Sequence, residues 1–220
     1  MRRRRLLWTA GLAGVGVWYV TVVRPATMRW GATDEEVARR LPGDDLVPGR
    51  RYRATRAITI EARPEHIWPW IVQIGSGRAG WYALDRIDNQ GVPSARSIIP
   101  ELQDLQVGDL IPMVVGKQIG PRVKEMEPPR RMLWATGDEF SWEWVLDPID
   151  EGRTRLITRM QERYPPLLSR KTLYTTVAST GDIVMHWKQL RGIKERAERL
   201  AAAADPVSPG PTDTVAARAP

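Results

Sequence analysis

Three glycines, Gly75, Gly77 and Gly80, have the G-x-G-x-x-G spacing of a dinucleotide-binding loop. In such a loop the glycines follow a strand and open a helix, so that backbone N–H groups hold a pyrophosphate. Here they follow the segment 64–75, in which apolar residues recur at the spacing of one helical face. We therefore expect the glycines to end a helix, and we predict neither a nucleotide nor any other cofactor at this loop.

Acid–base chemistry would require an ionisable side chain in an apolar site, where burial shifts its pKa. The candidates are Asp85, His66 and Glu101. Asp85 follows Trp81 and Tyr82, whose rings could exclude water, and it is the candidate acid or base; the alternative is that it caps a helical turn. His66 falls in the first turn of its helix and is expected at the surface. No catalytic residue is assigned from this pattern alone.

Composition excludes several classes of site. The chain has 220 residues and no cysteine, so disulfides, thiolate metal sites and a cysteine nucleophile are absent. Its two histidines are far apart in sequence, and we predict no metal site. Four arginines at positions 2–5 account for much of the net charge of +7. The rest of the chain has a net charge of +3, and its basic residues form no stripe with interleaved aromatic residues. We therefore predict no nucleic-acid partner.

Tryptophan is unusually frequent, with ten in the chain and eight outside the N-terminal apolar segment. So many large flat side chains indicate either a densely aromatic core or the wall of an apolar cavity. If there is a cavity, its ligand should contact residues on the inward faces of strands and beside the glycine loop. These are Trp70, Trp81, Tyr82, Met113, Trp134, Trp142, Trp144 and Met160.

The elements that would position these side chains can be read from periodicity. Segments 141–147 and 153–161 alternate apolar and polar residues and are joined by Asp150-Glu151-Gly152, which is typical of an antiparallel hairpin. Each segment has one polar face, so we expect a sheet covered on one side and exposed to water on the other. Further strands are expected at 56–61, 107–113, 122–126 and 131–135.

Helices should cover the apolar face of this sheet. Apolar residues recur at helical spacing between Ile183 and Ala197, which predicts a long amphipathic helix near the C-terminus. Shorter helices are expected at 34–40, capped by Thr33, and at 64–75. The predicted fold class is therefore α+β, with an antiparallel sheet packed on a long C-terminal helix.

An uncharged run at 6–23 follows the four arginines and would span about 27 Å as a helix, close to the thickness of a bilayer core. Trp8 near one end, and Trp18 and Tyr19 near the other, occupy positions typical of interfacial aromatics. A cleaved signal peptide is disfavoured, because arginine stands where cleavage needs a small residue. We expect an uncleaved single-pass anchor in the cell membrane, with the domain on the extracytoplasmic side.

By composition the chain divides into four parts. Residues 1–23 form the basic N-terminus and transmembrane anchor, and 24–50 form a connector with a short helix. Residues 51–200 form the folded domain, and 201–220 form a tail rich in Pro, Ala and Thr that is expected to be disordered. Any ligand site should lie in the folded domain.

Several stretches of the sequence resemble one known family. They are ITIEARPEHIWPWIVQIGSGRAGWYALDRIDN, PELQDLQVGD and RGIKERAE, with WGATDEEVARRLPGDDLVPG similar to actinobacterial members. Over roughly residues 30–200 the chain resembles the SRPBCC, or START-like (Bet v 1-like), superfamily, in its bacterial polyketide cyclase/dehydrase-like branch. The resemblance implies a helix-grip fold, in which a curved antiparallel sheet wraps a long C-terminal helix and leaves an apolar cavity. Relatives mostly carry lipids, sterols or other apolar molecules, and some cyclise polyketides.

Three functions follow from these observations. The favoured one is a membrane-tethered, non-catalytic domain that binds a hydrophobic small molecule or lipid between the sheet and the C-terminal helix. The second is a cyclase/aromatase-like enzyme that uses Asp85 as acid or base. The third is a structural envelope protein whose core is filled. The resemblance assigns no catalytic residues in this branch.

Overall fold

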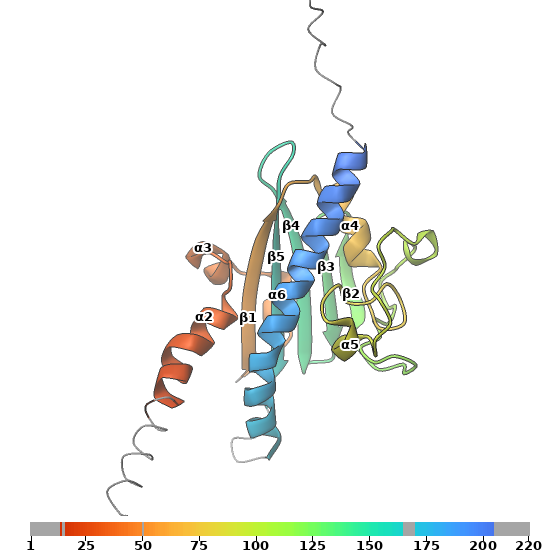
Figure 1. Ribbon diagram of the computed structural model, residues 1–220. Helices are drawn as coiled ribbons and strands as arrows, with labels where there is room; N and C mark the ends of the chain where they lie inside the picture. The colour runs from red at the N-terminus through yellow and green to blue at the C-terminus, as the bar shows by residue number, and fades with distance from the viewer. Residues whose placement is uncertain (1–13, 15, 50, 165–169, 205–220) are drawn as a thin grey trace, which may run out of the picture.

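A five-stranded antiparallel sheet forms the centre of the protein, and one long helix crosses one of its faces (Figure 1). The computed structural model describes residues 14, 16–49, 51–164 and 170–204. The order of strands across the sheet is β1-β5-β4-β3-β2. The strands are β1 (Arg51–Ile60), β2 (Arg122–Glu127), β3 (Arg131–Thr136), β4 (Phe140–Pro148) and β5 (Thr154–Arg163). The predicted α+β class is confirmed.

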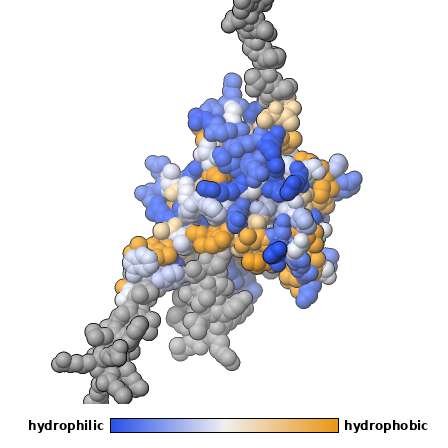
Figure 2. Space-filling model, viewed as in Figure 1, coloured by the Kyte–Doolittle hydropathy of each residue, from blue (hydrophilic) through white to orange (hydrophobic). Residues whose placement is uncertain are grey.

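The long helix is α6 (Arg170–Ala204), which packs against α4 and β1. Its residues Leu190, Ile193 and Ala197 are fully buried, as their helical spacing predicted. The outward side of the half of α6 that contains these three residues is hydrophilic (Figure 2). The shorter helices are α2 (Arg24–Met28), α3 (Asp34–Ala38), α4 (Pro64–Val72) and α5 (Asp85–Asp88), with η1 (Tyr19–Val23), η2 (Pro42–Asp45) and η3 (Pro100–Leu102).

The predicted hairpin is formed by β4 and β5. Trp142 pairs with Met160, and Leu146 pairs with Leu156. These side chains belong to the same buried cluster as Leu190 of α6, or pack against it, so the apolar faces of both strands point toward the helix. The alternation of apolar residues was therefore sufficient to place this hairpin and its inward face.

The prediction of a strand at 107–113 is wrong. Within the described residues this segment makes one isolated bridge to the sheet, between Leu110 and Arg122. Gly108 has a φ of 99°, and Pro112 has no N–H group to donate to a ladder. The segment is consequently a loop, and its last residue, Met113, borders the candidate site described below.

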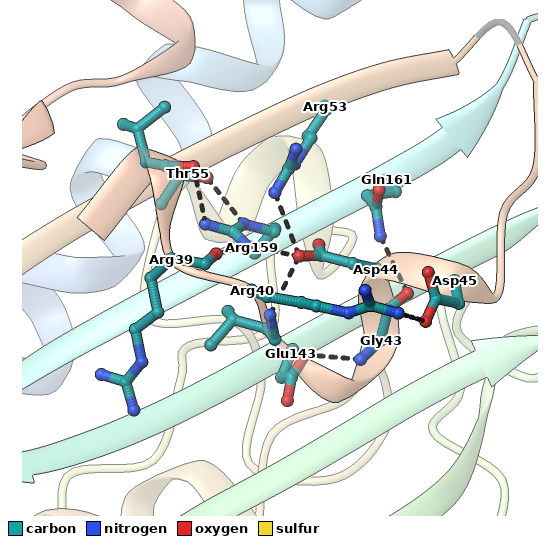
Figure 3. A network of polar contacts seen from close by, with 12 residues as sticks. Arg39, Arg40, Gly43, Asp44, Asp45, Arg53, Thr55, Glu143, Arg159 and Gln161 are labelled. Atoms are coloured by element: carbon teal, nitrogen blue, oxygen red, sulfur yellow. Dashed lines mark hydrogen bonds and ion pairs between the residues drawn. The ribbon is translucent and has the colours of Figure 1, made fainter. Parts of the chain in front are cut away.

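The second face of the sheet is covered, contrary to the prediction that it is exposed to water. The segment from α3 to η2 lies across it, with polar side chains in between (Figure 3). Arg159 is 1% exposed and donates to Asp44 at 2.8 Å and to Thr55 at 2.9 Å. Glu143 is 2% exposed and accepts a bond from the Gly43 N–H at 3.0 Å, and burial raises its pKa. Charged groups can leave water here because each is paired.

The predicted membrane anchor at 6–23 and the cell-membrane location are contradicted. Residues 1–13 and 15 lie outside the described part of the chain, as does the tail at 205–220. In the described part no helix is both long enough and apolar enough to cross a bilayer. The single-pass, extracytoplasmic assignment is corrected accordingly.

Candidate functional site

A partly open cavity of about 310 Å³ lies between the inner face of the sheet and α6. Strands β4 and β5 contribute Trp142 and Met160 to its wall, and the loop after the glycines contributes Trp81. The rest of the wall comes from α5 and its flanks, the 113–115 loop and α6. Those residues are Ala83, Ile87, Asp88, Gln90, Met113, Val114, Val115, Asp182, Met185, His186 and Gln189. Most of the lining is apolar, as a site for an apolar ligand requires.

Trp142 is the centre of an aromatic cluster in this wall. Its ring is stacked on that of Trp81, with centroids 6.0 Å apart and planes at 2°, and on that of Trp144 at 4.9 Å. Two hydrogen bonds fix the rings, because Trp81 Nε1 donates to Ser76 at 2.8 Å and Trp142 Nε1 donates to Thr158 at 2.7 Å. The flat faces are therefore held in place by the protein and need little ordering when a ligand binds.

A buried polar network adjoins the cavity. Arg56, only 1% exposed, donates to Asp182 Oδ2 at 2.8 Å and to the Tyr52 hydroxyl at 3.0 Å. The Tyr52 hydroxyl donates to the same Asp182 oxygen at 2.9 Å. Arg56 also contacts Nδ1 of His186, whose ring packs edge-on against Trp142 with centroids 5.1 Å apart. Two of these four side chains, Asp182 and His186, line the cavity.

The protonation states in this network follow from burial and neighbouring charge. Burial, and then the positive charge of Arg56, lower the pKa of His186 to about 3, so its ring is neutral at physiological pH. Burial acts to raise the pKa of Asp182, but the positive charge of Arg56 and the hydrogen bonds from Arg56 and Tyr52 outweigh burial, and the pKa is lowered. Burial, and then Asp182, raise the pKa of Tyr52. The network thus contains one cation, one anion and two neutral groups.

The residues predicted to bind ligand fall into two groups. Trp81, Met113, Trp142 and Met160 line the cavity. The other four, Trp70, Tyr82, Trp134 and Trp144, are buried in the core cluster and are absent from the cavity wall. All eight lie on the predicted side of the sheet or beside the glycine loop. Burial alone does not separate the two groups, because Trp81 and Trp142 belong to the same buried cluster as the other four.

Sequence reasoning missed the polar residues that α6 brings to the cavity. Asp182, His186 and Gln189 are spaced i, i+4, i+7 and all line it. The signal in the sequence was this row of polar residues on the otherwise apolar face of a helix. Burying polar side chains is costly unless they have hydrogen-bond partners, so such a row indicates a buried polar network.

Asp85, the candidate acid or base, does not line the cavity. Its carboxylate accepts hydrogen bonds from the backbone N–H of Ser94, at 3.0 Å, and from the Ser94 hydroxyl. It borders a separate surface groove whose wall includes Arg191 and Arg196. His66, the other imidazole considered, borders a further depression with Glu61 and Glu198 among its neighbours.

The glycine loop follows helix α4, as predicted, although that helix ends at Val72 and not at Gly75. Gly75 and Gly80 exchange backbone hydrogen bonds of 3.1 Å in each direction, which closes a tight loop. A Cβ atom at Gly80 would lie 2.4 Å from the hydroxyl oxygen of Ser94. Close packing against Ser94 thus accounts for glycine here without a nucleotide.

No protein-family model and no curated protein matches the chain. Several solved structures are similar in part. The chain covers 94% of a polyketide cyclase-like protein from Corynebacterium glutamicum, with 72% of its own length, 15% identity and a TM-score of 0.33. It covers 98% of the Zhui aromatase/cyclase from Streptomyces sp. R1128, with 70% of its own length, 16% identity and a TM-score of 0.35.

A third similar structure is an AHSA1-like protein from Rhizobium etli, of which the chain covers 98% with 79% of its own length, at 13% identity and a TM-score of 0.39. At such scores these similarities define no shared activity. The sheet and the C-terminal helix themselves have the helix-grip arrangement expected from the sequence resemblance.

Proposed function

We propose that the protein binds a hydrophobic small molecule in the cavity between the sheet and α6. The observation that carries this proposal is the cavity of about 310 Å³ with a stacked tryptophan wall. Side chains in protein interiors normally leave few voids larger than a water molecule. An open apolar space of this size, bordered by fixed aromatic rings, is the usual form of a ligand pocket.

The size of the cavity limits the ligand. An apolar cavity of about 150 Å³ is known to hold one benzene molecule. A cavity of about 310 Å³ is roughly twice as large, which suits a ligand of about two fused rings or an equally compact apolar chain. The flat face of Trp142 favours the ring system, because aromatic rings gain additional energy from offset or edge-on packing.

Binding is favoured over the cyclase-like alternative that uses Asp85. A general acid or base must come within hydrogen-bond reach of the proton that it transfers. Asp85 is outside the cavity wall and is occupied by Ser94. The alternative of a structural protein with a filled core is disfavoured by the open volume beside Trp142.

The test is calorimetric titration with 2-acetylnaphthalene, an uncharged two-ring probe. Ala83 lines the cavity, and Ala83→Trp should fill much of it and weaken binding at least about tenfold. Ala203, which is exposed near the end of α6, provides the matched control, and Ala203→Trp should bind as the unmodified protein does. Equal affinity in both variants, or no binding to the unmodified protein, would reject the proposal.

A further inference from the structure

We infer that the ligand of this cavity carries a hydrogen-bond-accepting oxygen, such as a ketone or ester carbonyl, and that Nε2–H of His186 donates to it. This inference rests on the proposed function, because it names the chemistry of the molecule that the cavity would hold. It is carried by three observations: the partners of the His186 ring, its burial, and its place in the cavity wall.

The partners of the ring determine which nitrogen bears the proton. Arg56 contacts Nδ1 of His186, and a guanidinium group has hydrogen-bond donors and no acceptor. Nδ1 must therefore act as the acceptor, and the single proton of the neutral ring must reside on Nε2. Asp182 does not reverse this assignment, because its hydrogen bonds among the described residues come from Arg56 and Tyr52 and not from the His186 ring. The ring thus presents Nε2–H as a donor, on the side away from Arg56.

That donor has no hydrogen-bond partner in the described part of the chain. Among the described residues, none makes a hydrogen bond to Nε2 of His186, although the side chain is only 2% exposed. Buried polar groups in native proteins nearly always have a partner, and those that have none need an explanation. Because His186 is part of the cavity wall, a molecule in the cavity is the natural partner.

A second buried donor without a partner among the described residues lies deeper in the same aromatic cluster. Nε1–H of Trp144 is also buried and without a partner in the described part of the chain. The ring centroids of Trp144 and His186 are 6.2 Å apart. Because Trp144 is absent from the cavity wall, the donor available to a ligand is that of His186, for which a carbonyl oxygen with two lone pairs provides an acceptor.

The experiment compares two probes of the same shape, 2-acetylnaphthalene and 2-isopropenylnaphthalene, in which a CH₂ group replaces the carbonyl oxygen. The unmodified protein should bind the ketone about 3- to 10-fold more tightly, as one additional hydrogen bond predicts. His186→Phe should abolish this preference while it still binds the hydrocarbon. Equal affinities for the two probes in the unmodified protein would overturn the inference and leave the proposed function intact. Binding of neither probe would reject both.

A measurement on the unmodified protein guards against a variant that fails to fold. In ¹⁵N-histidine-labelled protein, the ring of His186 should show a proton on Nε2 and a bare Nδ1, and only the ketone should shift the Nε2 resonance. His66→Gln removes the other histidine signal and completes the assignment. A proton on Nδ1, or the same shift with both probes, would contradict the inference.

Discussion

Replacing Arg159 should release the N-terminal segment from the outer face of the sheet. The guanidinium group donates five hydrogen bonds, with lengths of 2.7 to 3.2 Å. The acceptors are the side chains of Thr55 and Asp44 and the backbone carbonyls of Glu36, Val37 and Arg39. Arg159→Met keeps an unbranched apolar stem and removes every donor, which leaves three half-buried backbone carbonyls without this partner.

Breaking a buried ion pair by removing one partner costs about 3–5 kcal/mol. The lower part of that range is expected here, because Asp44 keeps Arg53 at 3.1 Å and the Leu41 N–H at 2.9 Å. Urea unfolding monitored by tryptophan fluorescence should therefore show Arg159→Met destabilised by about 3 kcal/mol. Limited proteolysis should also cut within residues 33–48 faster than in the unmodified protein.

Arg153 provides the control, because its ion pair with Asp150 lies at the exposed hairpin turn. Arg153→Met should leave both the unfolding midpoint and the proteolysis pattern unchanged. If Arg159→Met behaves like this control, the account of the outer face as a paired, buried interface is refuted.

Three further predictions concern the cavity and the glycine loop. The pKa of His186 is lowered to about 3 in the folded protein, so below pH ~6.5 the unfolded chain binds a proton that the folded protein does not. The free energy of unfolding should therefore fall as the pH drops from about 6.5 toward 3, by up to ~1.4 kcal/mol per pH unit. His186→Gln should reduce that slope in urea unfolding at several pH values, and an unchanged slope would contradict the burial of a neutral ring. Gly80→Ala should destabilise more than Gly77→Ala, since both have positive φ but only Gly80 meets Ser94; equal midpoints in thermal unfolding would contradict the packing argument. Asp85→Ala should lower stability by about 1–2 kcal/mol and leave 2-acetylnaphthalene affinity unchanged, and loss of binding in a folded variant would return Asp85 to the site.

The inner face of the sheet could be predicted from sequence because one rule governs it. Residues two apart in a strand share a face, so the apolar alternation that contains Trp142 and Met160 fixes both the hairpin and its inward side. The same rule cannot say which aromatic side chain borders empty space. Trp144 lies on the same face as Trp142, yet it is fully buried and absent from the cavity wall. That difference depends on how far α6 and the loops stand from each strand position.

The outer face and the polar network could not be predicted because they depend on contacts between residues distant in sequence. In the alternating pattern of its strand, Arg159 occupies a position that normally faces solvent, and its partner Asp44 lies 115 positions away. His186 and Arg56 are separated by 130 positions. A charged side chain in an alternating strand is solvated in most sheets, and only the placement of a covering segment with matched acceptors reverses that expectation.

Methionine methyl groups offer the most direct test of the cavity as a ligand site. Met113, Met160 and Met185 line it, whereas Met132 is fully buried elsewhere in the core. In protein labelled with ¹³C at the methionine methyl groups, titration with 2-acetylnaphthalene should shift the three cavity resonances together and saturably, and should leave that of Met132 in place. The absence of shifts at Met113, Met160 and Met185, or equal shifts at Met132, would contradict binding in the cavity between the sheet and α6.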